Sequence, residues 1–357
     1  MKQVDYLIIG QGISGSFISY FLLEKGASVL VIDHSPEYSA SKVASGMINP
    51  VTGRIVATTW MIHELLDFAT DTYYEVGKKL NENFISEKHI FTIPPTLQMH
   101  EALEKRVSEK NTFIKNISNA ESDLLKENFH FYFQPKKIQP AFLINVQLLL
   151  SSWKNYLEKF DCLEKSSFDF NALSLKKDRI EYKNIHARKI IFCNGIETFN
   201  YTPWKNLPYT ITKGEALIAS IPGLDENFMY KSGSLSIAPW QNDTWWIGSS
   251  FEHQFQDAQP SEKFRIKKEM ELKQLLKIPY KISGHLSSLR PGCIERKPFV
   301  GLHPNFPSLG ILNGMGTKGC SLAPFFAKQF SDYLLFGKPI EPLVHVERFK
   351  KILNRKL

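Results

Sequence analysis

The sequence predicts an α/β protein: a Rossmann-like, dinucleotide-binding domain with a parallel sheet, joined to a second, α+β domain on a mixed or antiparallel sheet. Three observations predict this fold. At the N-terminus an apolar run, the turn GQGISG, a helical pattern and a second apolar run follow one another. The order of strand, glycine turn and helix returns near the C-terminus. Between these ends, residues 211–251 alternate short apolar runs with turn residues, as strands of a second sheet do.

The N-terminal stretch forms a βαβ unit suited to a dinucleotide. Gly10 permits a tight turn after the strand Tyr6–Ile9. Gly12 lets the backbone approach a pyrophosphate, and Gly15 lets the following helix pack closely on the sheet. The phosphates would lie at the helix N-terminus, and Asp33 at the end of the second strand would accept hydrogen bonds from an adenosine ribose.

The helical spacing that begins at Ser14 is expected to end at Gly26, before a short buried strand at 27–32. The next stretch, 34–56, is rich in Ser, Gly, Pro and Asn. Its small residues indicate close approach of a ligand to the backbone, although a solvated surface loop has the same composition. A packed amphipathic helix is expected at 60–80.

The middle of the chain alternates strand-like and helical pieces. The expected strands are 89–93, 129–133, 166–170, 172–175 and 179–183, and the expected helices are 97–110 and 140–158, the latter begun by Pro140. Lys189–Gly195 predicts a buried parallel strand of the first sheet. Asn194 and Gly195 either turn over the cofactor or simply end that strand.

The last part of the chain is expected to return to the first domain. A helix at 264–276 carries lysines that we expect on its solvated face. The strand LGILNG, the turn GMGTKG and a helix ended by Gly337 then provide a second helix N-terminus that can hold negative charge. The predicted first domain comprises 1–80, 140–208 and 285–357, and the predicted second domain comprises 81–139 and 209–284.

Composition is that of an ordinary globular protein, with 357 residues of which 43% are hydrophobic and 22% charged. No apolar run is long enough to span a bilayer, so we expect no stable membrane insertion and a cytoplasmic location. The net charge of +8 is compatible with a nucleic-acid or acidic partner. Because Lys and Arg are spread along the whole chain, a lysine-rich surface is the favoured interpretation.

Cysteines and histidines give no metal signature. The four cysteines lie apart from one another and form no CxxC motif or Cys/His cluster, so we expect neither a metal site nor a disulfide framework. His63, His253, His285 and His303 are isolated in the sequence, and we expect packing or surface roles for them.

With these motifs in place, the chain resembles the FAD-dependent D-amino-acid oxidase superfamily over nearly its whole length. It is similar in style to glycine oxidases and to the oxidase domain of the bifunctional tRNA wobble-uridine modification enzyme. The resemblance lies in GQGISG with Asp33, ASGMINP, IIFCNG, KGEALI, LRPGCIERKPFVG and NGMGTKGCSLAP. Asp33 stands where the family usually has Glu, and it is a shorter residue that can make the same ribose contacts.

The resemblance implies FAD as the cofactor and assigns roles residue by residue. Arg290 of the LRP motif would anchor a substrate carboxylate, because a planar guanidinium binds a carboxylate bidentately. Thr317 and Lys318 would lie at the pyrimidine edge of the flavin, with Arg290 making up the catalytic set. The implied FAD contacts are Gly10, Gly12, Ile13, Ser14, Gly15, Asp33, His34, Ser41, Lys42, Ser45, Gly46, Met47, Asn194, Gly195, Gly314, Gly316, Thr317, Lys318 and Gly319.

The implied activity is oxidation of the amine carbon of a small amino acid or secondary amine, with hydride transfer to flavin N5 and reoxidation by dioxygen or another acceptor. Glycine oxidases tend to have an arginine where this chain has Thr317, which puts glycine itself in doubt as the substrate. Two alternatives stay open. One is a tRNA carboxymethylaminomethyl group as the substrate, which is not favoured. The other is a flavin-binding protein without turnover or a quinone-linked flavin dehydrogenase. The oligomeric state is not predicted.

Overall fold

The computed structural model describes residues 1–176 and 179–354. Its first sheet is built from β1 (Lys2–Ile9), β2 (Val29–Ile32), β11 (Leu163–Glu164), β12 (Leu173–Leu175), β13 (Ile180–Tyr182), β14 (Ile185–Phe192), β20 (Phe299–Leu302) and β21 (Leu309–Asn313). The strand order is β11-β2-β1-β14-β13-β12, with β21 beside β14 and β20 beside β21. β11, β2, β1, β14 and β21 pair in parallel, which confirms the predicted parallel sheet.

Helices cover this sheet because its strands are apolar on both faces. All of β2 and the second half of β1 are buried, as the continuous apolar runs predicted. The helices that pack on the sheet are α1 (Ile13–Glu24), α6 (Val146–Lys159) and α8 (Gly319–Phe336), and α3 (Ile62–Leu80) packs on α8 and α6. Gly26 and Gly337 follow α1 and α8 with φ of +77° and +68°, so both predicted helix ends are confirmed.

The second sheet is built from β7 (His89–Thr92), β8 (Ile114–Asn116), β9 (Lys136–Ile138), β15 (Tyr209–Ser220), β16 (Phe228–Ser232), β17 (Leu235–Pro239), β18 (Trp245–Gly248) and β19 (Lys281–Cys293). Its order is β19-β15-β18-β17-β16-β7-β9-β8. Only the β16/β7 pair in this sheet is parallel among the described residues, so the sheet is mixed, as predicted. α4 (Leu97–Ser108), α5 (Asn119–Asn128) and α7 (Glu262–Leu275) accompany it.

Short elements complete the fold. They are α2 (Ala40–Val43), β3 (Met47–Ile48), β4 (Val51–Thr52), β5 (Ala57–Thr58), β6 (Ile85–Glu87), β10 (Phe142–Ile144), α9 (Lys350–Leu353) and the 3₁₀ turns Phe170–Ala172, Gly195–Asn200, Thr202–Trp204 and Val346–Phe349. β3, β10 and β6 form a small antiparallel sheet in that order. The stretch 34–56 therefore contains a short helix and strand pieces, not a single irregular loop.

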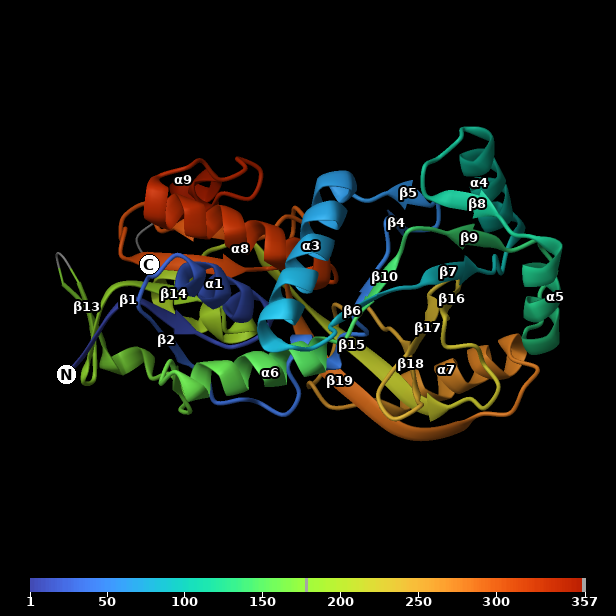
Figure 1. Cartoon of the computed structure of the whole chain (residues 1–357), viewed down its shortest axis with the longest axis horizontal. Helices are drawn as coiled ribbons and strands as arrows, with labels where there is room; N and C mark the ends of the chain where they lie inside the picture. The colour runs from blue at the N-terminus through green and yellow to red at the C-terminus, as the bar shows by residue number, and fades with distance from the viewer. Residues whose placement is uncertain (177–178, 355–357) are drawn as a thin grey trace.

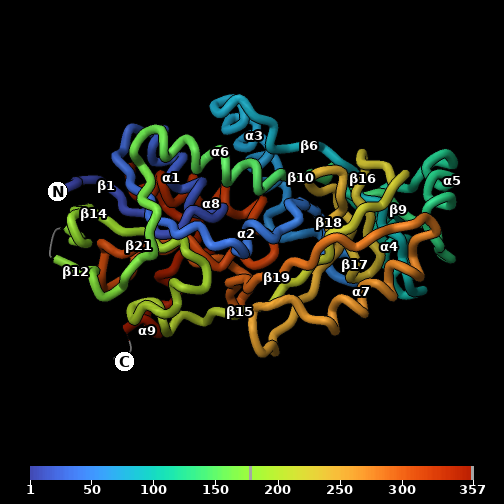
Figure 2. The backbone as a smooth tube through the Cα atoms, turned by 90° about the horizontal axis from the view of Figure 1, so that it is seen from below, coloured from blue at the N-terminus to red at the C-terminus, as the bar shows by residue number. Residues whose placement is uncertain are grey.

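β15 and β19 connect the two halves of the molecule. They are paired from Tyr209 opposite Cys293 to Ser220 opposite Lys281. Figure 1 shows the first sheet with α1 and α8 at one end of the long axis and the second sheet with α4, α5 and α7 at the other. In Figures 1 and 2 the β15 and β19 ribbons lie in the middle, between these ends.

Several predicted elements are wrong. Phe142–Ile144 is a strand, and Asn145 caps the start of α6 through its side chain, so the helix begins at Val146 and not at Pro140. Residues 129–133 form no strand beyond a single bridge from Phe129 to Leu276. The run 166–170 is also not a strand. The two expected strands that do not form are aromatic stretches in which local propensity was overridden by the surroundings, whereas Phe142–Ile144 was missed because the strand is too short to show a period.

Two further expectations need correction or comment. Lys268 of α7 is 2% exposed and pairs with Glu271 at 2.6 Å, so not all lysines of that helix face solvent. β19 runs across the predicted domain boundary at 284–285 and belongs to the second sheet as far as Cys293. The domain division itself stays a prediction. No helix in the described part of the chain is long and apolar enough to cross a membrane.

Candidate active site

One cavity of about 660 Å³ extends from the GQGISG turn to β15 and β19. It is walled by the start of α1, by the stretch 33–47 and by the turn before α8. At its other end lie Gly214 of β15 and residues 287–291 of β19. Segments that are far apart in the sequence, and that belong to both sheets, therefore share one enclosed space.

The glycine turn has the geometry that the sequence predicted. Gly10 has a φ of +95°, and a Cβ there would lie 2.7 Å from Cα of Asn194. At Gly15 a Cβ would lie 1.8 Å from the carbonyl oxygen of Gly10, so only glycine lets α1 approach β1 this closely. Gly12 is less constrained, since its nearest neighbour would be Ser41 Oγ at 3.2 Å.

The start of α1 and Asp33 suit an anionic dinucleotide. No side chain caps the helix, although Ser41 Oγ accepts a hydrogen bond from Ile13 N at 3.1 Å. Asp33 is oriented by Gln11 N, which donates to Oδ1 at 3.0 Å, and by Ser35 N, which donates to Oδ2 at 2.7 Å. A helix N-terminus open to a cavity attracts phosphate, and an oriented carboxylate accepts ribose hydroxyls. The residues present therefore fit the ADP half of FAD.

The stretch 33–47 is attached to both halves of the molecule. Trp246 of β18, which sequence reasoning missed, donates from Nε1 to Val43 O at 2.9 Å. The Lys42 ammonium donates to Pro36 O at 2.6 Å, and burial lowers the pKa of Lys42. Gly46 has a φ of +82°, and a Cβ there would lie 1.9 Å from Ile144 O. A glycine is therefore required at position 46 for packing, and the same residue also lines the cavity.

Most of the predicted FAD contacts line this cavity. They are Gly10, Gly12, Ile13, Ser14, Asp33, His34, Ser41, Lys42, Ser45, Gly46, Met47, Asn194, Gly195, Gly316, Thr317 and Gly319. Gly15, Gly314 and Lys318 do not line it. At Gly314 a Cβ would lie 2.7 Å from the ring of Phe299, so this glycine is required for packing. Contact with FAD stays a prediction for every member of the set.

Lys318 does not line the cavity. Its Nζ donates to Thr59 Oγ1 at 2.9 Å. Burial, together with Lys297 and Arg296, lowers the pKa of Lys318 to about 8. Its neighbour Thr317 does line the cavity, and Gly316 N donates to Pro291 O at 3.0 Å. The C-terminal glycine turn is therefore bonded directly to the strand that carries Arg290.

Arg290 lies on the cavity wall without an acidic partner. Its Nη1 donates to Ser250 O at 2.9 Å, and no carboxylate of the described residues lies within ion-pair distance of it. The guanidinium lies over the backbone of Gly214, where a Cβ would be 1.8 Å from Nη2. Burial lowers the pKa of Arg290 to about 10. A desolvated cation without a counter-charge is a strong site for an anion.

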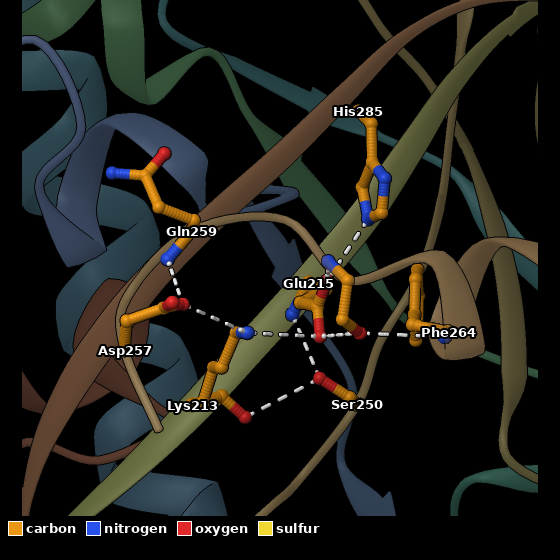
Figure 3. Close-up of polar contacts among 8 residues, drawn as sticks. Lys213, Glu215, Ser250, Asp257, Gln259, Phe264 and His285 are labelled. Carbon is orange, nitrogen blue, oxygen red and sulfur yellow. Dashed lines mark hydrogen bonds and ion pairs between the residues drawn. The ribbon is translucent and has the colours of Figure 1, made fainter. Parts of the chain in front are cut away.

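A polar cluster around Glu215 was missed in the sequence. The Glu215 side chain is fully buried, accepts from Ser261 N at 2.5 Å and Oγ at 2.8 Å, and lies 3.6 Å from Lys213 Nζ. His285 Nε2 lies 3.0 Å from Glu215 Oε2. Figure 3 shows Lys213 and His285 directed at this carboxylate. The contact between His285 and Glu215 has no signal in the sequence, and only the β15/β19 pairing reveals it.

Metal ligation has no candidate in residues 1–176 and 179–354, where no group of three or more His, Cys, Asp or Glu side chains is arranged to hold an ion. Cys193, Cys293 and Cys320 are buried, Cys162 is partly buried, and all four are free thiols.

Comparison with known proteins agrees with this geometry. Residues 5–123 match the family model described as FAD dependent oxidoreductase, DAO. The structure is similar to glycine oxidase from Geobacillus kaustophilus, at 16% identity over 95% of this chain and 96% of that chain, with a TM-score of 0.81. It is also similar to iminodiacetate oxidase from Chelativorans sp. BNC1, at 18% identity over 94% and 96%, with a TM-score of 0.75.

A third similar structure is L-amino acid deaminase from Proteus vulgaris. Its identity is 16% over 98% of this chain and 94% of that chain, and the TM-score is 0.78. At these identities the likeness is one of fold.

Proposed function

We propose that the chain, whose residues 5–123 match the family model described as FAD dependent oxidoreductase, DAO, oxidises the amine carbon of a small amino acid or secondary amine that carries a carboxylate. The observation that carries the proposal is Arg290, a partly buried guanidinium on the cavity wall with no acidic partner in the described residues. The similar structures are a glycine oxidase, an iminodiacetate oxidase and an L-amino acid deaminase, and glycine, iminodiacetate and L-amino acids all contain a carboxylate beside an amine carbon.

The chain's own residues would hold and orient the two reactants. The glycine turn, the start of α1 and Asp33 would hold the ADP half of FAD. Arg290 would hold the substrate carboxylate and so restrict where the amine carbon lies, which is the main demand of this chemistry. Bound FAD supplies a two-electron acceptor. The substrate loses a hydride from carbon and a proton from nitrogen, a C=N bond forms, and water then hydrolyses the imine.

Arg290→Ala tests the anchor. We expect the apparent KM of the best carboxylate-bearing substrate to rise by about 100-fold, because a charge-assisted hydrogen bond in a desolvated site contributes roughly 1.5–3 kcal/mol. Turnover of simple amines should change little. The matched control is Arg188→Ala, a surface residue with a 74% exposed side chain that pairs with Asp5. Equal effects on amines and amino acids would contradict the anchor role.

The substrate itself is best identified by anaerobic bleaching of the flavin. The panel comprises glycine, sarcosine, D-amino acids, proline and total tRNA, and is read by the loss of flavin absorbance. Rapid bleaching by a small amino acid supports the proposal. Bleaching by tRNA alone would favour the tRNA alternative, and the electron acceptor is then identified by reoxidising the reduced protein with dioxygen or a quinone.

A further inference from the structure

Ser288 of β19 has a buried hydroxyl with no hydrogen-bond partner in the described part of the chain. The residue is 5% exposed, and it lines the cavity together with Gly214 and Arg290. Buried polar groups in proteins are nearly always hydrogen-bonded. A buried hydroxyl on the wall of a cavity, without a partner in the protein, therefore points to a ligand in that cavity.

Ser288 and Arg290 lie on the same face of β19. They are two residues apart on a strand that pairs with β15 without a register shift over 284–293, so their side chains leave the same face. The side chain of Ser287 leaves the opposite face, as does that of His285, which is directed at the buried carboxylate described above (Figure 3). Of the two adjacent serines, Ser288 is therefore the one that can share a small ligand with Arg290.

The Arg290 guanidinium lies beside the Ser288 side chain. Ser288 pairs with Gly214 across the two strands, and the Cβ atoms of residues paired in this way are about 5 Å apart. Gly214 has no Cβ, and the guanidinium occupies the vacant space, since a Cβ there would lie 1.8 Å from Nη2 and 1.9 Å from Cζ of Arg290. The glycine thus brings the charged group to within about 5 Å of the Ser288 Cβ.

The guanidinium and the hydroxyl are suited to binding one anion. Nη1 of Arg290 donates to Ser250 O at 2.9 Å, and no carboxylate of the described residues lies within ion-pair distance of the group. Because a guanidinium contains only donors, the hydroxyl beside it turns its oxygen toward the positive charge and its proton away. That proton is free for an acceptor in the cavity. A protonated amine would be repelled here, whereas a carboxylate would gain a hydrogen bond from each group.

We propose that Ser288 is a second substrate-binding residue, whose hydroxyl donates a hydrogen bond to the carboxylate that Arg290 holds. This inference rests on the proposed function and deepens it. Two donors from neighbouring positions on one strand face fix the orientation of the carboxylate as well as its position. The amine carbon attached to that carboxylate is then restricted to one direction from the strand, which is the kind of positioning that this chemistry needs.

The test measures the affinity of propionate for the FAD-loaded protein by calorimetric titration. Propionate has the carboxylate but no amine, so it is not oxidised at an amine carbon and reports on the carboxylate contacts alone. We expect Ser288→Ala to weaken propionate binding about tenfold, since a hydrogen bond to a charged group contributes at least that factor. Flavin content and the absorbance spectrum of the unliganded protein should stay as in the wild type.

Ser287→Ala is the matched control. It removes a similarly buried hydroxyl from the adjacent position, on the opposite face of the strand. We expect it to leave the propionate affinity unchanged. Equal weakening by Ser287→Ala and Ser288→Ala would show a general effect of losing a hydroxyl from this strand, and would overturn the inference.

Arg290→Ala separates this inference from the proposed function. If Arg290→Ala weakens propionate binding and Ser288→Ala does not, Ser288 does not contact the ligand and the carboxylate anchor still stands. If the wild-type protein binds no propionate, or Arg290→Ala leaves its affinity unchanged, the anchor itself fails and this inference fails with it. An altered unliganded flavin spectrum in Ser288→Ala, with wild-type propionate affinity, would assign the hydroxyl to the cofactor and also overturn the inference.

Discussion

The two ends of the cavity are built in different ways. The dinucleotide end is formed mainly by backbone groups of one contiguous segment, the glycine turn and the start of α1. Its key residues are glycines, at which a side chain would clash with neighbouring backbone. At the substrate end, charged and polar side chains from β15 and β19, about 70 positions apart in the chain, are brought together only by strand pairing. The dinucleotide end has little room for an added side-chain atom, whereas ligand binding at the substrate end depends on which side-chain functional groups are present.

This difference predicts distinct kinds of failure. A substitution at the dinucleotide end should affect folding and FAD content together. A substitution at the substrate end should leave the flavoprotein intact and change only what it binds. Two substitutions test the distinction, and a third tests a charged residue that lies outside the cavity wall.

The largest effect is expected for Gly15→Ala. Its new Cβ would lie 1.8 Å from Gly10 O, and backbone atoms on both sides leave little room to adjust. We expect a loss of about 3 kcal/mol or more in the free energy of unfolding and little retained flavin, measured by denaturant titration and by absorbance. Gly284→Ala on β19, where the nearest atom would be a side-chain carbon at 3.4 Å, is the control. A stable Gly15→Ala protein that retains its flavin would contradict the proposed difference between the two ends of the cavity.

A smaller and more selective effect is expected for Gly214→Ala. The Cβ would overlap the Arg290 guanidinium, which is the movable end of a side chain and is expected to shift. FAD content should stay normal while carboxylate affinity falls by about 10- to 100-fold. Combining the change with Arg290→Ala should add little further loss, because both act on one interaction. Additive losses would show that Gly214 acts by another route.

The smallest effect is expected for Lys318→Met. The pKa of Lys318 is lowered to about 8 in the folded protein, so between about pH 8 and 10.5 the unfolded chain binds more protons and stability rises with pH. Below about pH 8 the cost of the buried charge is fully present. The variant's advantage in unfolding free energy should therefore shrink, by about 1 kcal/mol, from pH 7 to pH 10. Lys338→Met, an exposed lysine just beyond α8, is the control for this pH series. A pH-independent difference would contradict the lowered pKa.

Sequence reasoning was strongest where a motif is contiguous. The Gly10 turn, α1 ended by Gly26, and the parallel strands β1, β2, β14 and β21 were predicted because apolar runs and glycines carry their own signals. The strand at Phe142–Ile144 was missed because three residues give no measurable period. Its pairing with β3 and β6 is a tertiary effect.

The same holds for the candidate site: its residues in local motifs were predictable, and its contacts between distant segments were not. Arg290 was recognisable from the LRP motif, but nothing local reveals that it lacks an acidic partner or that it lies over Gly214. The contact between His285 and Glu215 was not predicted, because the two residues lie on different strands. Such pairs depend on the β15/β19 register, which one sequence does not determine.

The hydrogen bond from Gly316 N to Pro291 O closes the intervening chain into a loop whose two ends meet at the cavity. β20 and β21 lie within this loop, and residues 305–307 at its far side are exposed. Extra residues inserted at 305–307 would therefore be accommodated outside the cavity without altering the spacing between Arg290 and Thr317. A single residue inserted at either end of the loop would change that spacing directly. The positions at which insertions are tolerated should therefore mark the boundary of the site more clearly than the positions at which side chains can be substituted.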